Sequence, residues 1–278
     1  LEHEIARFDV SSFSDTAQVA AYPILTYPYD PFLTAQSAVV MDDTSKVFIF
    51  EKNPGIRFSM ASTTKIMTAL VALEQYALND PLLVYSDTIE GSTIGLRRGE
   101  RYTLDSLLYA MLLPSANDAA EAIAANYPGG RAAFIKRMNE KAREMALSDT
   151  QYDDPAGLED DGNFTTASDL AKLSSRALKN ETIARIVGTK QKIISDVSGV
   201  HKISLENLNE LLGSNGVIGI KTGFTQGAGG VLATARRENG HTQIIVVMKS
   251  LDRFGDTLSL LRLITNNITY FTPAYSPI

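Results

Sequence analysis

Residues 229–248 read GGVLATARRENGHTQIIVVM, and this stretch decides the class of fold. Two apolar runs, 229–238 and 242–248, lie on either side of Asn239-Gly240. An Asn-Gly pair between such runs is the strongest short signal for a two-residue turn joining antiparallel strands. The stretch therefore predicts a β-hairpin near the carboxyl end of the sequence.

A second hairpin is expected near the amino end, from residues 37–41 and 46–50. Both runs are rich in β-branched and apolar residues, and Asp42-Asp43-Thr44-Ser45 between them is typical of a turn. Residues 88–188 instead follow a helical pattern. Helices are expected at 104–113 with Thr103 as cap, at 116–126, at 131–147, at 170–178 with Ser168 as cap, and at 256–264.

Strands at both ends and helices between them predict one antiparallel sheet assembled from distant segments. The fold class is α/β (α+β): a sheet flanked by helices, with an inserted all-helical subdomain. We expect residues 1–35, with Pro23, Pro28 and Pro31, to be an irregular lead-in. Residues 36–278 then form the main domain, with the sheet part at 36–87 and 189–278 and the helical subdomain at 88–188.

The composition narrows the range of functions. The chain has 278 residues, 44% of them hydrophobic and 21% charged, which is typical of a globular protein with a sizeable core. A net charge of -6 argues against a nucleic-acid partner. There is no cysteine, and His3, His201 and His241 are far apart, so we expect no thiol chemistry, no metal site and no cofactor. No run of 18 apolar residues and no signal peptide is present.

The candidate nucleophile heads a helix expected at residues 62–76. The apolar residues of this segment surround the helix, which indicates burial, yet its first turn is polar. Ser62 and Lys65 are three residues apart and so share one face. A serine needs a base to take its proton, and a buried lysine next to a second cation, here Lys221, can be that base. The ordinary alternative is a capping serine with a solvated lysine.

Ser115-Ala116-Asn117 follows Pro114 in the link between two predicted helices. Ser115 is placed to relay a proton to a leaving amine, and the Asn117 amide is suited to holding a peptide backbone. Taken alone, Ser115 is expected to do no more than cap the next helix.

Lys221-Thr222-Gly223 ends the apolar strand at residues 217–220. A glycine there permits close approach of an extended substrate to the strand edge. The backbone N–H groups of Ser62 and Phe224 are candidates for an oxyanion hole. Taken alone, this motif is a strand that ends in a glycine turn.

The three motifs occur in the order Ser-x-x-Lys, Ser-x-Asn and Lys-Thr-Gly, which is known from β-lactamases and penicillin-binding proteins. With their surroundings, they make the chain resemble the low-molecular-mass penicillin-binding proteins of the serine D-Ala-D-Ala carboxypeptidase family over about residues 36–272. The segments that carry this resemblance are ASTTKIMT at 61–68, SANDAA at 115–120, TASDLA at 166–171, NLNELL at 207–212 and GIKTGFT at 219–225.

The resemblance implies a β-lactamase/transpeptidase-like fold and removal of the terminal D-alanine from peptidoglycan stem peptides through a Ser62 acyl-enzyme. It implies acylation of Ser62 by β-lactam antibiotics and a place outside the cytoplasm. Many relatives continue into a small β domain and an amphipathic anchor. Peripheral membrane attachment would therefore come from segments outside this sequence.

The resemblance also implies that Arg253, with Thr222, binds the carboxylate of the substrate, although a plain surface arginine is the alternative. The chain departs from its relatives at Thr63, where an apolar residue is usual. It departs again at Asp154-Pro155-Ala156-Gly157-Leu158, around which relatives often carry asparagine and histidine. Nearby, Glu159, Asp160 and Asp161 are expected to be solvated loop charges. They lack the sequence context of a deacylating glutamate.

Three alternatives remain open at this stage. The same chemistry would suit a murein endopeptidase or a weak β-lactamase. A protein that is acylated without turnover would instead be a sensor module for β-lactams or muropeptides.

Overall fold

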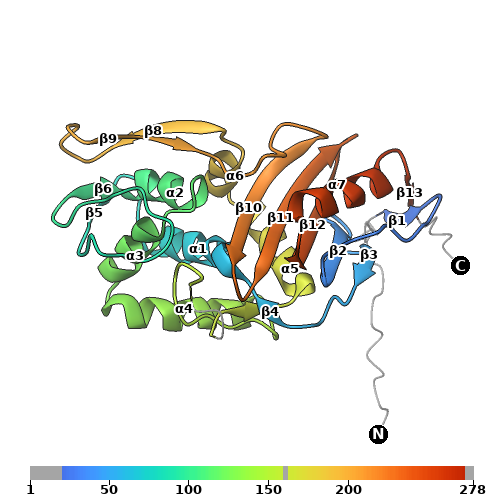
Figure 1. Cartoon of the computed structure of the whole chain (residues 1–278), viewed down its shortest axis with the longest axis horizontal. Coiled ribbons are helices and arrows are strands. Elements are labelled where there is room, and N and C mark those ends of the chain that lie inside the picture. Colours follow the sequence, from blue (N-terminus) through green and yellow to red (C-terminus); the bar gives the residue numbers. More distant parts are fainter. Residues whose placement is uncertain (1–20, 159–161, 273–278) are drawn as a thin grey trace, which may run out of the picture.

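A computed structural model describes residues 21–158 and 162–272 of the chain. At its centre is a five-stranded antiparallel sheet with the order β10-β11-β12-β2-β3 (Figure 1). Its strands are β2 (Ser37–Asp42), β3 (Phe48–Lys52), β10 (Val217–Thr225), β11 (Gly229–Glu238) and β12 (His241–Ser250). The sheet unites distant segments as predicted, because β12 pairs with β2 in a register that places Val246 opposite Val39.

Both predicted hairpins are confirmed. In the β11–β12 turn, Asn239 and Gly240 have φ angles of 50° and 81°, as a two-residue turn between twisted strands requires. In the β2–β3 turn, Asp42 Oδ1 accepts the backbone N–H of Ser45 at 2.7 Å. Local turn chemistry is therefore enough to define these two connections.

The sheet is buried on both faces, because alternate residues of each strand enter different cores. Val39 and Ile244 face a core shared with the helical part of the molecule. Val40 and Ile245 face a second core, which is completed by leucines of α7 (Arg253–Ile264). Covering helices on both sides of the sheet confirm the predicted fold class (Figure 1).

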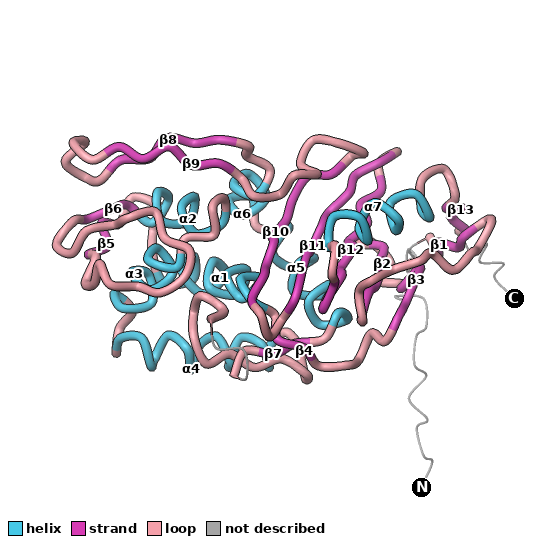
Figure 2. The backbone as a smooth tube through the Cα atoms, viewed as in Figure 1, coloured by secondary structure: helices cyan, strands magenta, loops and turns pink. Residues whose placement is uncertain are grey.

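The helices gather mainly at one end of the sheet, beyond its β10 edge (Figure 2). Thr103 caps its helix as predicted, accepting the N–H of Ser106 at 3.2 Å. The prediction that Ser168 caps a helix is wrong: Thr166 does so, accepting the N–H of Asp169 at 3.1 Å. Besides α7, the helices are α1 (Lys65–Gln75), α2 (Leu104–Leu112), α3 (Asn117–Asn126), α4 (Gly130–Glu144), α5 (Ala167–Leu178) and α6 (Glu181–Val187).

Several short strands were not foreseen. Within the expected lead-in, β1 (Tyr22–Leu25) pairs with β13 (Ile268–Phe271). Residues 1–20 of the lead-in lie outside the described residues. The predominantly helical part also contains two strands, β6 (Arg101–Thr103), paired with β5 (Pro81–Leu83), and β7 (Phe164–Thr165), paired with β4 (Phe58–Ser59).

A further hairpin, β8 (Gln191–Ser195) and β9 (Lys202–Glu206), lies apart from the central sheet. Sequence reasoning placed residues 189–278 with the sheet, but this hairpin forms its own two-stranded sheet beside α2 (Figure 1). Its turn is fixed to β6, since the N–H of Val197 donates to the carbonyl of Arg101 at 2.8 Å. This hairpin was not predicted from the sequence.

Candidate active site

The first two motifs meet at the amino end of α1. Ser62 lies in a short 3₁₀ turn, η2 (Ala61–Thr64), which leads directly into the helix. The ammonium of Lys65 donates to Ser62 Oγ at 2.8 Å and to Asn117 Oδ1 at 2.7 Å. Lys65 is completely buried, so the alternative of a solvated lysine is wrong.

A third acceptor completes the surroundings of Lys65. The backbone carbonyl of Ala156 accepts from Lys65 Nζ at 2.6 Å. The three acceptors match the three N–H bonds of a charged lysine. When the amine is neutral, Asn117 and Ala156 can retain two N–H bonds, and the lone pair is then directed at Ser62 Oγ. Sequence reasoning missed Ala156, because a backbone carbonyl has no residue signature.

Burial lowers the pKa of Lys65 from 10.5 to about 7. Carboxylates oppose this shift, with Asp154 the largest contributor, followed by Glu121 and Asp118. A substantial fraction of Lys65 is therefore neutral near pH 7 and able to accept a proton. Lys221 was expected to act as the second cation that lowers the pKa of Lys65. The effect found is on Lys221 instead: burial lowers its pKa, and the charges of Lys65 and Arg253 lower it further.

The third motif lies along β10, the edge strand of the sheet that faces the helical part. Lys221 and Thr222 are both buried, and Lys221 Nζ donates to the carbonyl of Thr222 at 2.9 Å. Phe224 is 63% exposed. The motif thus places two buried polar side chains and one exposed aromatic ring at the end of an edge strand.

In the structure, the need for glycine at position 223 comes from its contact with the turn that carries Ser62, rather than from room for substrate. A Cβ at this position would lie 3.2 Å from both the carbonyl oxygen of Met60 and the backbone nitrogen of Ser62. Such contacts are tighter than most real Cβ contacts, so glycine lets β10 pack directly against the turn that carries Ser62. Gly223 of the Lys-Thr-Gly motif thus sets how closely β10 approaches Ser62.

Ser115 is buried, and its hydroxyl has no hydrogen-bond partner. Its backbone has φ of 68°, in the left-handed region that few serines adopt. The alternative that Ser115 caps the next helix is wrong, because the N-cap of α3 is Ala116 and no side chain caps it. A strained residue with an unpaired buried hydroxyl indicates a function rather than a structural role.

Arg253 is the first residue of α7, and its side chain lies across β11. A Cβ on Gly230 would be 3.2 Å from Arg253 Cβ, and Gly230 is the cross-strand partner of Phe224. The Nε of Arg253 is buried without a hydrogen-bond partner. The residue as a whole is half-buried, and its guanidinium carbon lies 4.8 Å from the ring centroid of Phe254, so carboxylate binding by Arg253 stays a prediction.

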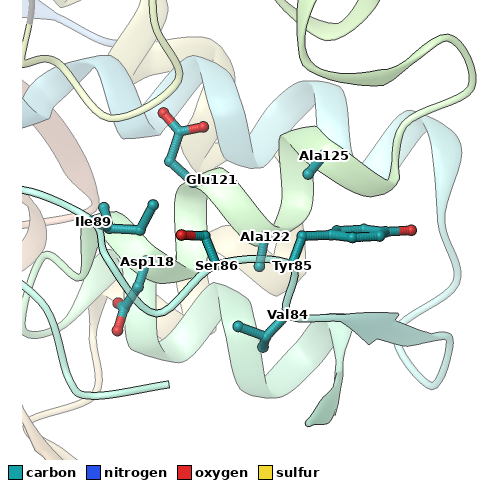
Figure 3. A pocket seen from close by; sticks show the side chains of 8 residues that line it. All are labelled: Val84, Tyr85, Ser86, Ile89, Asp118, Glu121, Ala122 and Ala125. Atoms are coloured by element: carbon teal, nitrogen blue, oxygen red, sulfur yellow. The ribbon is translucent and has the colours of Figure 1, made fainter. Parts of the chain in front are cut away.

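Other features lie away from these motifs. A cavity of about 90 Å³ separates residues 84–89 from α3 and is lined in part by Asp118 and Glu121 (Figure 3). Ser62 is not among its lining residues. Glu159, Asp160 and Asp161 lie outside the described residues. Among residues 21–158 and 162–272, no three histidine or carboxylate side chains are grouped so that they could hold a metal ion.

Comparison with known proteins identifies the family. The sequence profile of the S11 peptidases, described as D-alanyl-D-alanine carboxypeptidase, matches residues 26–251. The chain belongs to the S11 peptidase family. It is a serine peptidase of the DD-carboxypeptidase or DD-endopeptidase type, as the three motifs predict.

Individual relatives carry both activities in their names. The D-alanyl-D-alanine carboxypeptidase DacF of Bacillus subtilis is 35% identical over 77% of this chain, which spans 57% of the length of DacF. The D-alanyl-D-alanine endopeptidase of Pseudomonas aeruginosa is 32% identical, with coverage of 82% of this chain and 74% of that protein. A mutant of the Streptomyces K15 DD-transpeptidase superposes with a TM-score of 0.81 and is 33% identical, with coverage of 85% and 100%.

Proposed function

We propose that this S11 peptidase is a serine D-Ala-D-Ala carboxypeptidase that removes the terminal D-alanine from peptidoglycan stem peptides. The observation that carries the proposal is the 2.8 Å contact between Lys65 Nζ and Ser62 Oγ, with Asn117 and Ala156 holding the remaining N–H bonds of the amine. This arrangement pairs a nucleophile with an oriented base.

The proposed reaction uses these groups as follows. Ser62 Oγ attacks the carbonyl carbon of the penultimate D-alanine while neutral Lys65 takes the hydroxyl proton. The backbone N–H groups of Ser62 and Phe224 stabilise the oxyanion. The carbon–nitrogen bond then breaks, and D-alanine leaves with a proton that Lys65 returns through Ser115. Water attacks the acyl-enzyme in the same way and regenerates Ser62. β-Lactams acylate Ser62 by the same route, because Ser62 Oγ attacks the carbonyl carbon of the β-lactam ring.

The charges beside β10 support a carboxypeptidase over an endopeptidase. Burial lowers the pKa of both Lys65 and Lys221, so the lasting positive charge that acts on this region is that of Arg253. A guanidinium, with the hydroxyl of Thr222 on the strand, favours a substrate that ends in a free carboxylate. An endopeptidase substrate whose leaving amine carries no carboxylate next to the scissile bond gains nothing from this charge.

The other parts of the proposal concern partners and location. The substrate is a peptidoglycan peptide, β-lactams are competing acylating agents, and neither nucleic acid nor a cofactor takes part. Since the family acts outside the cytoplasm, we place this protein at the bacterial cell surface or in the periplasm. Within the described residues, no helix combines the length and the apolar character needed to cross a bilayer.

Substrate amidation tests the choice between the two activities. Wild type should cleave a diacyl-D-Ala-D-Ala peptide with a free carboxylate far faster than its C-terminal amide. Arg253→Ala should lower kcat/KM for the free acid on the order of 10²-fold and leave cleavage of the amide nearly unchanged, because the guanidinium would grip only the carboxylate.

Arg262→Ala, on the exposed side of the same helix, is the matched control and should behave as wild type. Equal rates on the free acid and the amide in wild type would replace the carboxypeptidase assignment with the endopeptidase. Acylation by penicillin without release of D-alanine would instead identify a sensor module.

A further inference from the structure

The loop that supplies the Ala156 carbonyl is organised around one buried carboxylate. Asp154 Oδ1 accepts the backbone N–H groups of Ala156 at 2.6 Å and of Gly157 at 2.5 Å. Its Oδ2 accepts the N–H of Leu158 at 3.0 Å and a hydrogen bond from Asn163 Nδ2. Hydrogen bonds from these four donors to one carboxylate hold the turn in a single arrangement.

The same turn is fastened to the nucleophile helix on both sides of Ala156. Thr68 of α1 donates to the carbonyl of Pro155 at 2.6 Å. A Cβ on Gly157 would lie only 1.9 Å from the carbonyl oxygen of Ala61. The direction of the Ala156 carbonyl is therefore set by Asp154 from within the turn and by α1 and η2 from outside.

Charge adds a second effect on Lys65. The carboxylates whose charges act on this lysine are Asp154 from the loop and Glu121 and Asp118 from α3. The charge of Lys65 in turn acts on Lys221 of β10. Asp118 is buried and accepts several backbone N–H groups, and Glu121 pairs with Arg131. Asp154 contributes most among the carboxylates that oppose the lowering of the Lys65 pKa by burial.

We propose that Asp154 is a positioning residue that governs Lys65 in two ways. Its carboxylate shapes the turn so that the Ala156 carbonyl directs the lone pair of the lysine at Ser62, and its negative charge favours the protonated amine. The inference rests on the proposed function, in which Lys65 is the base.

The test is the pH profile of the second-order rate constant for penicillin acylation. Activity needs neutral Lys65, so the rate should rise with pH through a limb set by the pKa of that lysine, which lies near 7. Asp154→Asn removes a negative charge that stabilises the ammonium. Its acid limb should therefore move to lower pH by about half a unit or more. Its plateau should fall about tenfold or more, because an amide has one acceptor oxygen and cannot hold all four donors.

Two further variants separate charge from geometry. Asp154→Glu keeps the charge but displaces the carboxylate, so its acid limb should stay close to that of wild type while its plateau falls about tenfold or more. Asp153→Asn removes an exposed charge one residue away and should change neither quantity. Circular dichroism checks that each variant is folded.

The outcomes are distinct. An acid limb of folded Asp154→Asn that stays in place or moves to higher pH overturns the electrostatic part of the proposal. A wild-type plateau in Asp154→Glu overturns the positioning part, even if the asparagine variant fails to fold. If wild type itself is not acylated at Ser62, the proposed function fails, and the profiles no longer bear on Asp154.

Discussion

At the scale of single residues, Lys65 is the group on which the site depends. It is fully buried, it contacts Ser62, Asn117 and Ala156, and burial brings its pKa to about 7. A base with a pKa near the working pH is both available and strong enough to be useful. The hydrogen bonds of Lys65 thus define the direction of the base, and its burial sets the strength.

We predict that Lys65→Ala slows penicillin acylation by a factor on the order of 10² or more, because general-base catalysis is lost. The variant should stay folded but be less stable by about 1–3 kcal/mol, since Asn117 Oδ1 and the Ala156 carbonyl lose a donor. Stopped-flow acylation and thermal unfolding measure the two effects. Lys136→Ala, on the exposed face of α4, is the control. Near-normal acylation by a folded Lys65→Ala protein would transfer the base role to another residue.

At the scale of elements, the site depends on the close contact of the 154–158 turn, the η2 turn and the end of β10. Gly157 has φ of 84°, and a side chain there would collide with the carbonyl of Ala61. Gly223 meets the same η2 turn from the strand side. Two glycines therefore let three segments distant in sequence pack against one another.

We predict that Gly157→Ala lowers the free energy of unfolding by about 3 kcal/mol or more and greatly reduces penicillin acylation, because left-handed strain and a backbone collision combine. Gly199→Ala is the control, with φ of 75° and no neighbouring atom within 4 Å of its added Cβ. It should cost only about 1–2 kcal/mol and leave acylation unchanged. Chemical denaturation measures both variants, and equal losses would show that the contact with η2 is unimportant.

The elements also show how far sequence reasoning reaches. The Asn239-Gly240 and Asp42 turns and the Thr103 cap were predicted, because each depends on chemistry within a few residues. Thr166 rather than Ser168 caps α5, a shift of two residues that only the course of the backbone decides. Three other features depend on tertiary contacts that no local pattern encodes. They are the pairing of β1 with β13, the position of the β8–β9 hairpin beside α2, and the contact of the Ala156 carbonyl with Lys65.

At the scale of the whole molecule, the chain brings β2 and β3 from its amino-terminal part together with β10, β11 and β12 in one sheet, and it places the helical part against the β10 edge. Ser62 lies at that junction, with Asn117 from the helical side and Lys221 from the sheet. The order of the three motifs along the sequence predicted this meeting, because each was expected at the end of a different element. Sequence reasoning did not reveal the acceptors around Lys65.

The most direct test of this account is the mass of the intact protein after incubation with penicillin. We predict that wild type gains one ligand mass, that peptide mapping places the adduct on Ser62, and that Ser62→Ala gains nothing, since the attacking oxygen is gone. Circular dichroism confirms that the variant is folded. An adduct that persists in Ser62→Ala, or that maps to Ser115, would contradict the central claim that Ser62 is the nucleophile.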